Sequence, residues 1–223
     1  MAKVQKKDTH VWYEKFRPKK MSQIILPKRL MDRFENGLDT NLLLSGTAGT
    51  GKTTLAKVLS LDRSILFLNG SMNNSIENVR EDIMVFGSTN SMIHRGKKKV
   101  VIIDECEKFS FAAQEALKGV IEALHENVIF IFTTNSPEKL SDPIRKSRLH
   151  EIEFKFSNEE SNEMMNGYVD RIRYVLKHNK RTITNSALKY LIRTMFPDFR
   201  RIYNALQSIH SSTVDGHEIT VSD

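Results

Sequence analysis

The sequence has little that would tie it to an oxidising compartment, a membrane or a metal-stabilised fold. It has a single cysteine, Cys106, so an internal disulfide is impossible and a reducing compartment is expected. No apolar run approaches the roughly 18 residues that a membrane-spanning helix needs. The polar, basic N-terminus lacks the apolar segment of a signal peptide. The seven histidines show no metal-ligand spacing, which argues against a zinc site. These absences predict a cytoplasmic protein without a membrane partner.

The excess positive charge is concentrated at the N-terminus. Of the net charge of +7, residues 1–20 contribute +5, because they hold seven Lys/Arg and two Asp/Glu. Residues 1–10 are expected to be a solvated basic tail, and the run Lys97-Lys98-Lys99 a solvated loop before a strand. The composition permits a polyanionic partner without requiring one.

Apolar runs alternate with helical patterns over the first two thirds of the chain, which is typical of an α/β fold. Expected strands lie at residues 41–45, 65–68, 100–103, 128–132 and 150–154, the last at a sheet edge. Ser75 and Ser110 are expected to cap helices that run to about Phe86 and His125. Because the runs lack polar alternation, we predict a parallel five-stranded sheet covered by helices on both faces.

From Ser157 onward the pattern changes to helices alone. Three helices are expected at about 157–178, 184–195 and 198–209, with no strand between them. The predicted domains are therefore an α/β core at 1–157 and a small helical domain at 158–223.

A glycine-rich run at residues 46–53 follows the first strand and opens a helix. Glycines let successive N–H groups point inward, and the helix N-terminus adds partial positive charge. Lys52 can then reach the β- and γ-phosphates of a nucleoside triphosphate, and Thr53 can bind Mg²⁺. The predicted nucleotide-binding residues are Gly46, Thr47, Ala48, Gly49, Thr50, Gly51, Lys52, Thr53 and the adjoining Thr54.

Polar side chains end two later strands. Asp104 is suited to holding Mg²⁺, and Glu105 to acting as the base that orients an attacking water. Asn135 follows the next strand and would lie beside that pair, where its amide could hold the water or sense the γ-phosphate. By itself, Asn135 fits a simple turn about equally well.

Several boxes in fixed order resemble the AAA+ ATPases, and among them the small subunits of sliding-clamp loaders. W-Y-E-K-F-R-P at 12–18 is similar to their W-x-E-K-[YF]-R-P box, and L-N-G-S at 68–71 to a later one. Ser147-Arg148 matches the start of their S-R-C box, with Leu149 in place of the cysteine. Ile25-Leu26-Pro27 and F-P-D-F-R at 196–200 are similar to the T-even bacteriophage members. The resemblance covers residues 11–211.

The resemblance implies further residue roles. Arg17 and Pro18, with Ile24, Ile25 and Trp12 of the first box, would serve ATP binding on the adenine side. Arg148 would be an arginine finger acting on ATP in a neighbouring subunit, and Arg200 would reach the γ-phosphate in its own subunit. Arg80 would follow the DNA backbone, and Gln114 would couple DNA contact to the acidic pair. The implied catalytic set is Lys52, Glu105, Asn135, Arg148 and Arg200.

The sequence departs from the family in two places besides Leu149. The acidic box reads Asp104-Glu105-Cys106-Glu107 where D-E-A-D is usual, but the first two acids are retained. Family members also continue into a third helical domain, the collar, and we expect this chain to lack it.

The implied function is ATP-dependent loading of a sliding clamp onto primer–template DNA in phage-type replication, in the cytoplasm of a bacterial host. Its partners would be other loader subunits, the clamp, and DNA without sequence preference. Two alternatives remain at this stage: another AAA+ motor or remodelling ATPase, and an ATP-switched scaffold that does not hydrolyse ATP.

Overall fold

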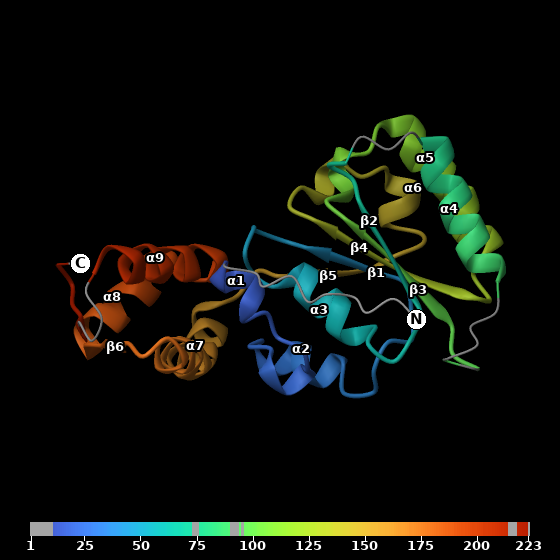
Figure 1. The fold of residues 1–223 in the computed structure, drawn as a ribbon. Coiled ribbons are helices and arrows are strands. Elements are labelled where there is room, and N and C mark those ends of the chain that lie inside the picture. Colours follow the sequence, from blue (N-terminus) through green and yellow to red (C-terminus); the bar gives the residue numbers. More distant parts are fainter. Residues whose placement is uncertain (1–10, 73–75, 90–93, 95, 214–217, 223) are drawn as a thin grey trace, which may run out of the picture. The chain divides into compact units, whose positions relative to one another are not determined.

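The computed structural model describes residues 11–72, 76–89, 94, 96–213 and 218–222 (Figure 1). These residues belong to two compact units. One is an α/β unit, Arg29–Lys155, and the other combines the segment up to Lys28 with the residues from Phe156 onward.

A five-stranded parallel sheet forms the centre of the α/β unit (Figure 1). Its strands run in the order β2-β3-β4-β1-β5, which confirms the predicted parallel sheet and puts β5 at one edge. They are β1 (Leu42–Ser45), β2 (Ile65–Asn69), β3 (Lys99–Asp104), β4 (Val128–Thr134) and β5 (His150–Glu153). The central strands are fully buried because both faces of their apolar runs are covered.

Helices lie on both faces of this sheet. They are α2 (Lys28–Arg33), α3 (Lys52–Leu59), α4 (Ile76–Ser88), α5 (Phe111–Ala123) and α6 (Asp142–Arg145), with short 3₁₀ turns η2 (Cys106–Lys108) and η3 (Pro137–Lys139). Apolar side chains of α4, α5 and α6 pack with alternate residues of β3 and β4 in one core. Helix α3 lies on the opposite face (Figure 1). The cap predicted at Ser110 is present, since its Oγ accepts the Ala113 N–H at 3.2 Å. The cap predicted at Ser75 falls outside the described residues.

Three long helices build the other unit. They are α7 (Asn158–His178), α8 (Asn185–Met195) and α9 (Phe199–Ser212), accompanied by α1 (Trp12–Lys15) and η1 (Met21–Gln23). Ser157, Thr184 and Asp198 each cap the helix that follows with a side-chain oxygen. One expectation is corrected here, because β6 (Thr182–Ile183) lies between α7 and α8 and pairs with β7 (Glu218–Ile219). Strands of two residues carry no readable alternation, and the pairing partner lies far along the chain.

The described residues from Val11 to Lys28 belong to the helical unit, whereas the sequence assigned them to the α/β core. Trp12 and Phe16 are 5% and 6% exposed and join the core formed by α7, α8 and α9. The Trp12 N–H donates to Gln207 Oε1 at 2.9 Å, and Arg171 donates to the Phe16 carbonyl. These partners are more than 150 residues away in sequence, so no local pattern could indicate them.

The three-lysine run before β3 is not simply a solvated loop. Lys97 pairs with Asp62, and Lys98 Nζ donates to the His125 carbonyl just after α5 at 2.8 Å. Lys99 is 6% exposed and its Nζ donates to Thr89 Oγ1 and to the Phe86 carbonyl near the end of α4. Burial lowers the pKa of Lys99. Each ammonium therefore connects the start of β3, or the two residues before it, to a different neighbouring segment.

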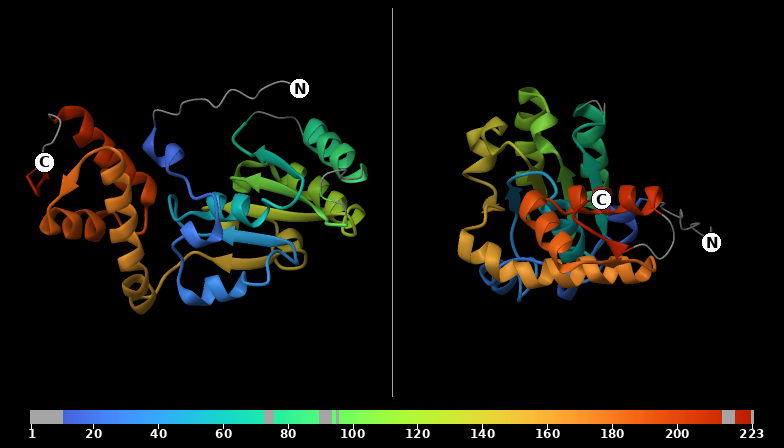
Figure 2. Two further views of the ribbon diagram at one scale, coloured as in Figure 1. Left: turned by 60° about the horizontal axis from the view of Figure 1, so that its bottom comes forward. Right: turned by 90° about the vertical axis from the view of Figure 1, so that its left-hand side faces the viewer.

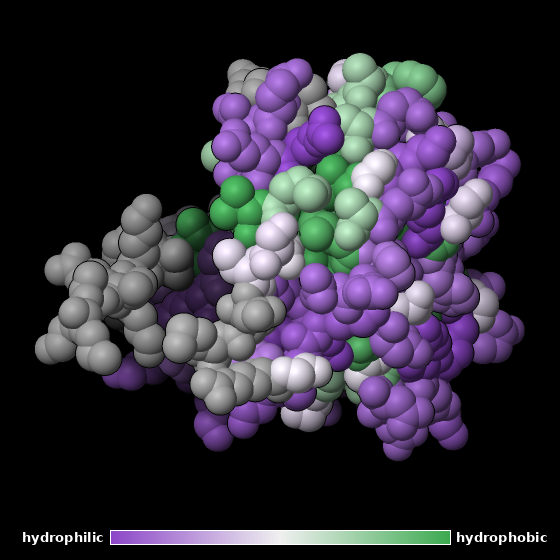
Figure 3. All heavy atoms as spheres, turned by 90° about the vertical axis from the view of Figure 1, so that its right-hand side faces the viewer, coloured by the Kyte–Doolittle hydropathy of each residue, from purple (hydrophilic) through white to green (hydrophobic). Residues whose placement is uncertain are grey.

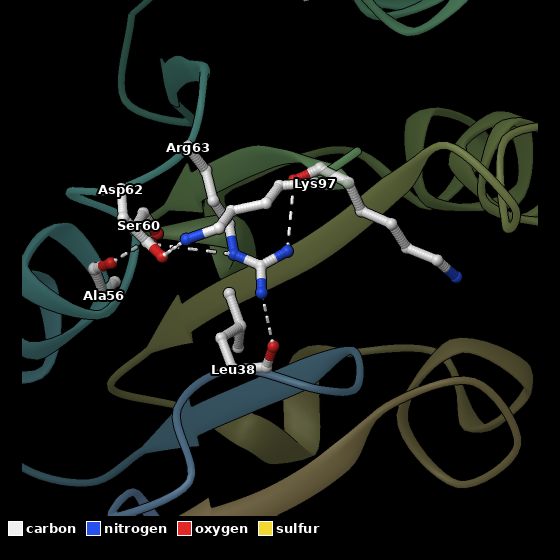
Figure 4. A network of polar contacts seen from close by, with 7 residues as sticks. Leu38, Ala56, Ser60, Asp62, Arg63 and Lys97 are labelled. Atoms are coloured by element: carbon white, nitrogen blue, oxygen red, sulfur yellow. Dashed lines mark hydrogen bonds and ion pairs between the residues drawn. The ribbon is translucent and has the colours of Figure 1, made fainter. Parts of the chain in front are cut away.

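Arg63 extends this set of contacts at the start of the sheet (Figure 4). Its guanidinium donates to the carbonyls of Leu38 at 2.8 Å and Lys98 at 3.1 Å. The chain after α3, the turn before β1 and the lysine run are thereby joined.

Hydrophilic side chains dominate the face shown in Figure 3, with a limited apolar area among them. Among the described residues, none of the helices has the length and apolar character to cross a bilayer. Figure 2 shows the same ribbon from two other directions.

Candidate nucleotide site

The predicted phosphate-binding loop connects β1 to α3 at the carboxyl end of the sheet. Gly51 precedes α3 with a φ of 97°, in the left-handed region that glycine tolerates. Gly46 has a φ of 135°, and a Cβ there would lie 2.9 Å from the Phe154 carbonyl oxygen. Thr50 Oγ1 donates to the Thr47 carbonyl at 2.8 Å, which fixes the middle of the loop. The backbone conformation of this turn thus favours glycine at positions 46 and 51.

The Lys52 side chain lies inside the phosphate-binding loop. The side chain is buried, and Nζ donates to the carbonyls of Gly46 at 2.8 Å and Thr47 at 2.7 Å. A third bond of 2.9 Å runs to Asn135 Oδ1 at the end of β4. The structure therefore brings the P-loop lysine and the residue after β4 together, whereas the sequence had placed Asn135 beside the acidic pair Asp104-Glu105.

Asp104 lies at the end of β3, next to both the loop helix and β4. Thr53 Oγ1 donates to Asp104 Oδ1 at 2.6 Å, and the Thr133 hydroxyl donates to the same oxygen. A hydroxyl beside a carboxylate is an oxygen-donor set that suits Mg²⁺, which usually takes one or two carboxylates together with substrate phosphates. Within the described part of the chain, no group of three or more His, Cys, Asp or Glu side chains is arranged so that it could hold a metal ion.

Glu105 follows directly and has a φ of 53°, an unusual conformation for a residue with a side chain. Its backbone approaches Gly70 so closely that a Cβ on Gly70 would lie 2.5 Å from the Glu105 carbonyl oxygen. The Ser71 hydroxyl donates to the Glu105 carboxylate, and the Glu105 N–H donates to Thr133 Oγ1 at 3.4 Å. The predicted base is therefore held by residues from the ends of β2 and β4.

The sequence patterns assigned no role to three residues of this site: Ser71, Thr133 and Glu107. Thr133 precedes Asn135 on β4, and polar residues ending an apolar strand beside Asp104 were the available signal. Glu107 Oε1 accepts the Asn135 N–H at 3.2 Å. Ser71 ends the L-N-G-S box at 68–71, but its contact with Glu105 follows from the pairing of β2 with β3, where Asn69 lies opposite Asp104.

The other predicted residues of the α/β unit lie apart from this cluster of contacts. Arg148 is held in its own chain by the Glu122 carboxylate and by the Pro143 carbonyl, at 2.6 Å from Nη1. Arg80 lies exposed on α4. Gln114 is buried, and its amide bonds the Phe109 and Lys139 carbonyls and the Ser141 N–H. Gln114 thus links the start of α5 to the segment after β4.

The residues expected on the adenine side belong to the helical unit, together with Arg200. Trp12 is part of that unit's core, while Arg17 pairs with Glu14 within α1 and the following turn. Ile25 packs against Gly167 of α7. The Arg200 guanidinium lies 5.4 Å from the centre of the Tyr13 ring, a cation–π contact.

The fold and the loop define a P-loop nucleotide-binding protein. A sequence profile for the ATPase family associated with various cellular activities (AAA) matches residues 42–157. The chain belongs to this AAA family, and membership implies nucleotide binding.

Several proteins with similar sequences are named as replication proteins. Replication factor C subunit 4 of Saccharomyces cerevisiae is 32% identical over 95% of this chain and 66% of its own length. The sliding-clamp-loader large subunits of Escherichia phage RB69 and Enterobacteria phage T4 are each 32% identical over 92% of this chain and 66% of theirs. The chain thus spans slightly less than two thirds of these relatives.

Solved structures with the same fold include a variant of Thermotoga maritima RuvB, with a TM-score of 0.68 at 20% identity. That match covers 93% of this chain and 70% of the other. At this identity the likeness concerns the fold alone.

Proposed function

We propose that this chain is an ATP-hydrolysing subunit of a sliding-clamp loader that places a clamp on primer–template DNA. The supporting observation is that a full set of phosphate, metal and base residues occurs in a chain similar to clamp-loader subunits over 92% of its length. Its partners would be further loader subunits, the clamp and primed DNA, in the cytoplasm. Such DNA contacts, including one from Arg80, would be made to phosphates without sequence readout.

In the proposed mechanism, loop amides and Lys52 bind the phosphates, and Lys52 exchanges its carbonyl partners for phosphate oxygens. Thr53 and Asp104 would hold Mg²⁺, which neutralises phosphate charge when bound. Glu105 accepts the proton of the attacking water, and Asn135 orients that water. Arg17, Pro18, Ile24 and Ile25 serve the adenine side, and Arg200 the γ-phosphate.

Arg148 is proposed to act on ATP in a neighbouring subunit. For this, Arg148 must leave its ion pair with Glu122 and bind the neighbouring phosphate instead. The Glu122 carboxylate is exposed, and the hydrogen bond from Arg148 lowers its pKa. Because the Glu122 side of this ion pair is exposed to solvent, the pair contributes little to stability and assembly can displace it at little cost. Gln114 would transmit DNA contact to the acidic pair through the segment after β4.

The test is a steady-state ATPase assay with the cognate clamp, the companion subunit and primed DNA. We expect primed DNA and clamp together to stimulate turnover, and Lys52→Ala to abolish it in the same complex. Turnover that is unaffected by clamp and DNA would contradict clamp loading while leaving ATP hydrolysis intact.

An ATP-switched scaffold is the second candidate, because Arg148 is bound within its own chain in this structure. Sizing with and without ATP, combined with turnover measured against protein concentration, separates the two. An enzyme assembled by ATP gains specific activity with concentration, whereas a scaffold assembles without turnover. Another AAA motor is disfavoured by the W-Y-E-K-F-R-P box, which such motors do not need.

A further inference from the structure

Glu107 is an acidic residue at the carboxyl edge of the sheet to which the proposed mechanism gives no role. It lies on η2, two residues past the base Glu105. Its Oε1 accepts the Asn135 N–H at 3.2 Å, while Oε2 is buried without a hydrogen-bond partner in the described part of the chain. A buried carboxylate oxygen without a partner is costly for the fold, so stability alone does not explain this residue.

Asn135, the partner of Glu107, and its neighbour Thr134 both contact the phosphate-binding loop. Thr134 accepts the Gly46 N–H at 3.2 Å through its carbonyl, and Asn135 Oδ1 holds the Lys52 ammonium at 2.9 Å. A hydrogen bond that fixes the backbone of Asn135 therefore also fixes the direction of its side-chain amide, which contacts Lys52. Glu107 is one hydrogen bond from Asn135 and two from Lys52.

Charge-assisted hydrogen bonds are typically about 2.7–2.9 Å long. The bond from Asn135 to Glu107 is 3.2 Å, so its role is to hold the direction of Asn135 rather than to add unusual strength. A glutamine at 107 would keep the acceptor but lose the charge, and an alanine would lose both. The two substitutions therefore separate the geometry of the contact from its strength.

We propose that Glu107 is a positioning residue of the nucleotide site: it fixes Asn135, and through it the amide that orients water and contacts Lys52. The inference rests on the proposed ATPase function for its effect on turnover. Its structural half, the hold on Asn135, stands on the hydrogen bonds alone. Because Asn135 is proposed to orient the attacking water, Glu107 should influence the chemical step more than the binding of ATP.

The experiment compares Glu107→Ala, Glu107→Gln, Asn135→Ala and the Glu107→Ala/Asn135→Ala double variant. Glu138→Ala, an exposed acidic residue in the next turn, is the matched control. Three quantities are measured: hydrogen exchange of the Asn135 amide in the nucleotide-free chain, the Kd of ATP, and kcat in the assembled complex. Thermal unfolding checks that each variant is folded.

We expect Glu107→Ala to speed hydrogen exchange at Asn135 and to lower kcat about tenfold. This is the lower end of the roughly 10–100-fold loss of activity seen when a residue that hydrogen-bonds to a metal ligand is replaced. The Kd of ATP should stay within about twofold, and Glu107→Gln should keep most of kcat. The double variant should be no slower than Asn135→Ala, because both changes remove one chain of contacts.

Unchanged exchange at Asn135 in Glu107→Ala would overturn the proposal, as would additive losses in the double variant. Equal losses in kcat and ATP affinity, or equal behaviour of the alanine and glutamine variants, would also overturn it. If the wild type binds ATP but never turns it over, the proposed function fails, and the exchange measurement still decides whether Glu107 holds Asn135.

Discussion

At Gly46 the phosphate-binding loop lies against Phe154, the residue that follows β5. The Gly46 φ of 135° lies where side chains are strained, and an added Cβ would meet the backbone after β5 at 2.9 Å. We expect Gly46→Ala to destabilise the protein by about 2 kcal/mol or more, since strain and overpacking combine. The measurement is urea unfolding of both proteins.

Gly119→Ala is the control for this substitution. Gly119 is exposed within α5, and nothing lies within 4 Å of an added Cβ. The helix should then gain about 0.5–1 kcal/mol. A Gly46→Ala protein as stable as the wild type would contradict the close fit between the loop and β5.

Glu151 connects β5 to the strand that leads into the loop. Its carboxylate accepts from Ser45 Oγ at 2.8 Å and from Arg145 Nε at 2.7 Å. Burial favours the neutral acid, but the hydrogen bonds from Arg145 and Ser45 outweigh burial and lower the pKa below the ordinary value of 4.5. The stabilisation is therefore present above that pH and is lost as pH falls through the lower folded value.

We expect Glu151→Gln to weaken the acid dependence of stability below about pH 5, because a glutamine does not titrate. The comparison is the free energy of unfolding of wild type and variant from about pH 7 to pH 3. Parallel curves would show that this carboxyl does not contribute to acid unfolding.

At the scale of elements, the lysine run shows how a strand is tied to its neighbours. Lys99→Ala removes a buried donor and leaves the Phe86 carbonyl and Thr89 hydroxyl without it. We expect a loss of about 2 kcal/mol in urea unfolding. Lys98→Ala, whose ammonium is exposed, should change stability by less than about 0.5 kcal/mol. Equal effects of the two substitutions would contradict the distinction.

Helix α1 is held in the helical unit by packing rather than by its own sequence. Trp12 and Phe16 supply two aromatic rings to its core, although they lie at the opposite end of the sequence. A short helix of this kind is not stable in isolation, so its position follows from what it packs against. The W-Y-E-K-F-R-P box therefore has a packing role besides the adenine role proposed for its Arg17 and Pro18.

At the scale of the whole molecule, the proposed role of Arg148 can be tested by mixing two inactive variants. Lys52→Ala would lack ATP binding but supply Arg148, while Arg148→Ala would bind ATP without a finger from its neighbour. Each variant alone should lose about 10³-fold or more in turnover. A mixture should recover part of it, because some interfaces then pair an intact loop with an intact finger.

The matched control mixes Arg148→Ala with the Lys52→Ala/Arg148→Ala double variant, which supplies no finger. Turnover should stay low in that mixture. Recovery there, or no recovery in the first mixture, would contradict action across a subunit boundary.

Much of the α/β unit could be predicted because its signals are local. Each buried strand is a continuous apolar run, and Ser110 shows its cap within three residues of its partner. The sequence placed Asn135 beside the acidic pair because the carboxyl ends of parallel strands share one edge, but its hydrogen bond to Lys52 was not predicted. Glu107, Thr133 and Ser71 were given no role because their contacts join strand ends from different parts of the chain.

The sequence by itself determined the alternation of strands and helices, the glycine loop with its lysine, and the acids that end β3. These are set by periodicity, turn geometry and charge, which act over a few residues. Only the tertiary structure decided that Trp12 and Phe16 complete the helical core, that Lys99 is buried, and that Glu107 holds Asn135. The reason is physical: packing and hydrogen bonding between distant segments depend on where the chain returns, and no local spacing records that.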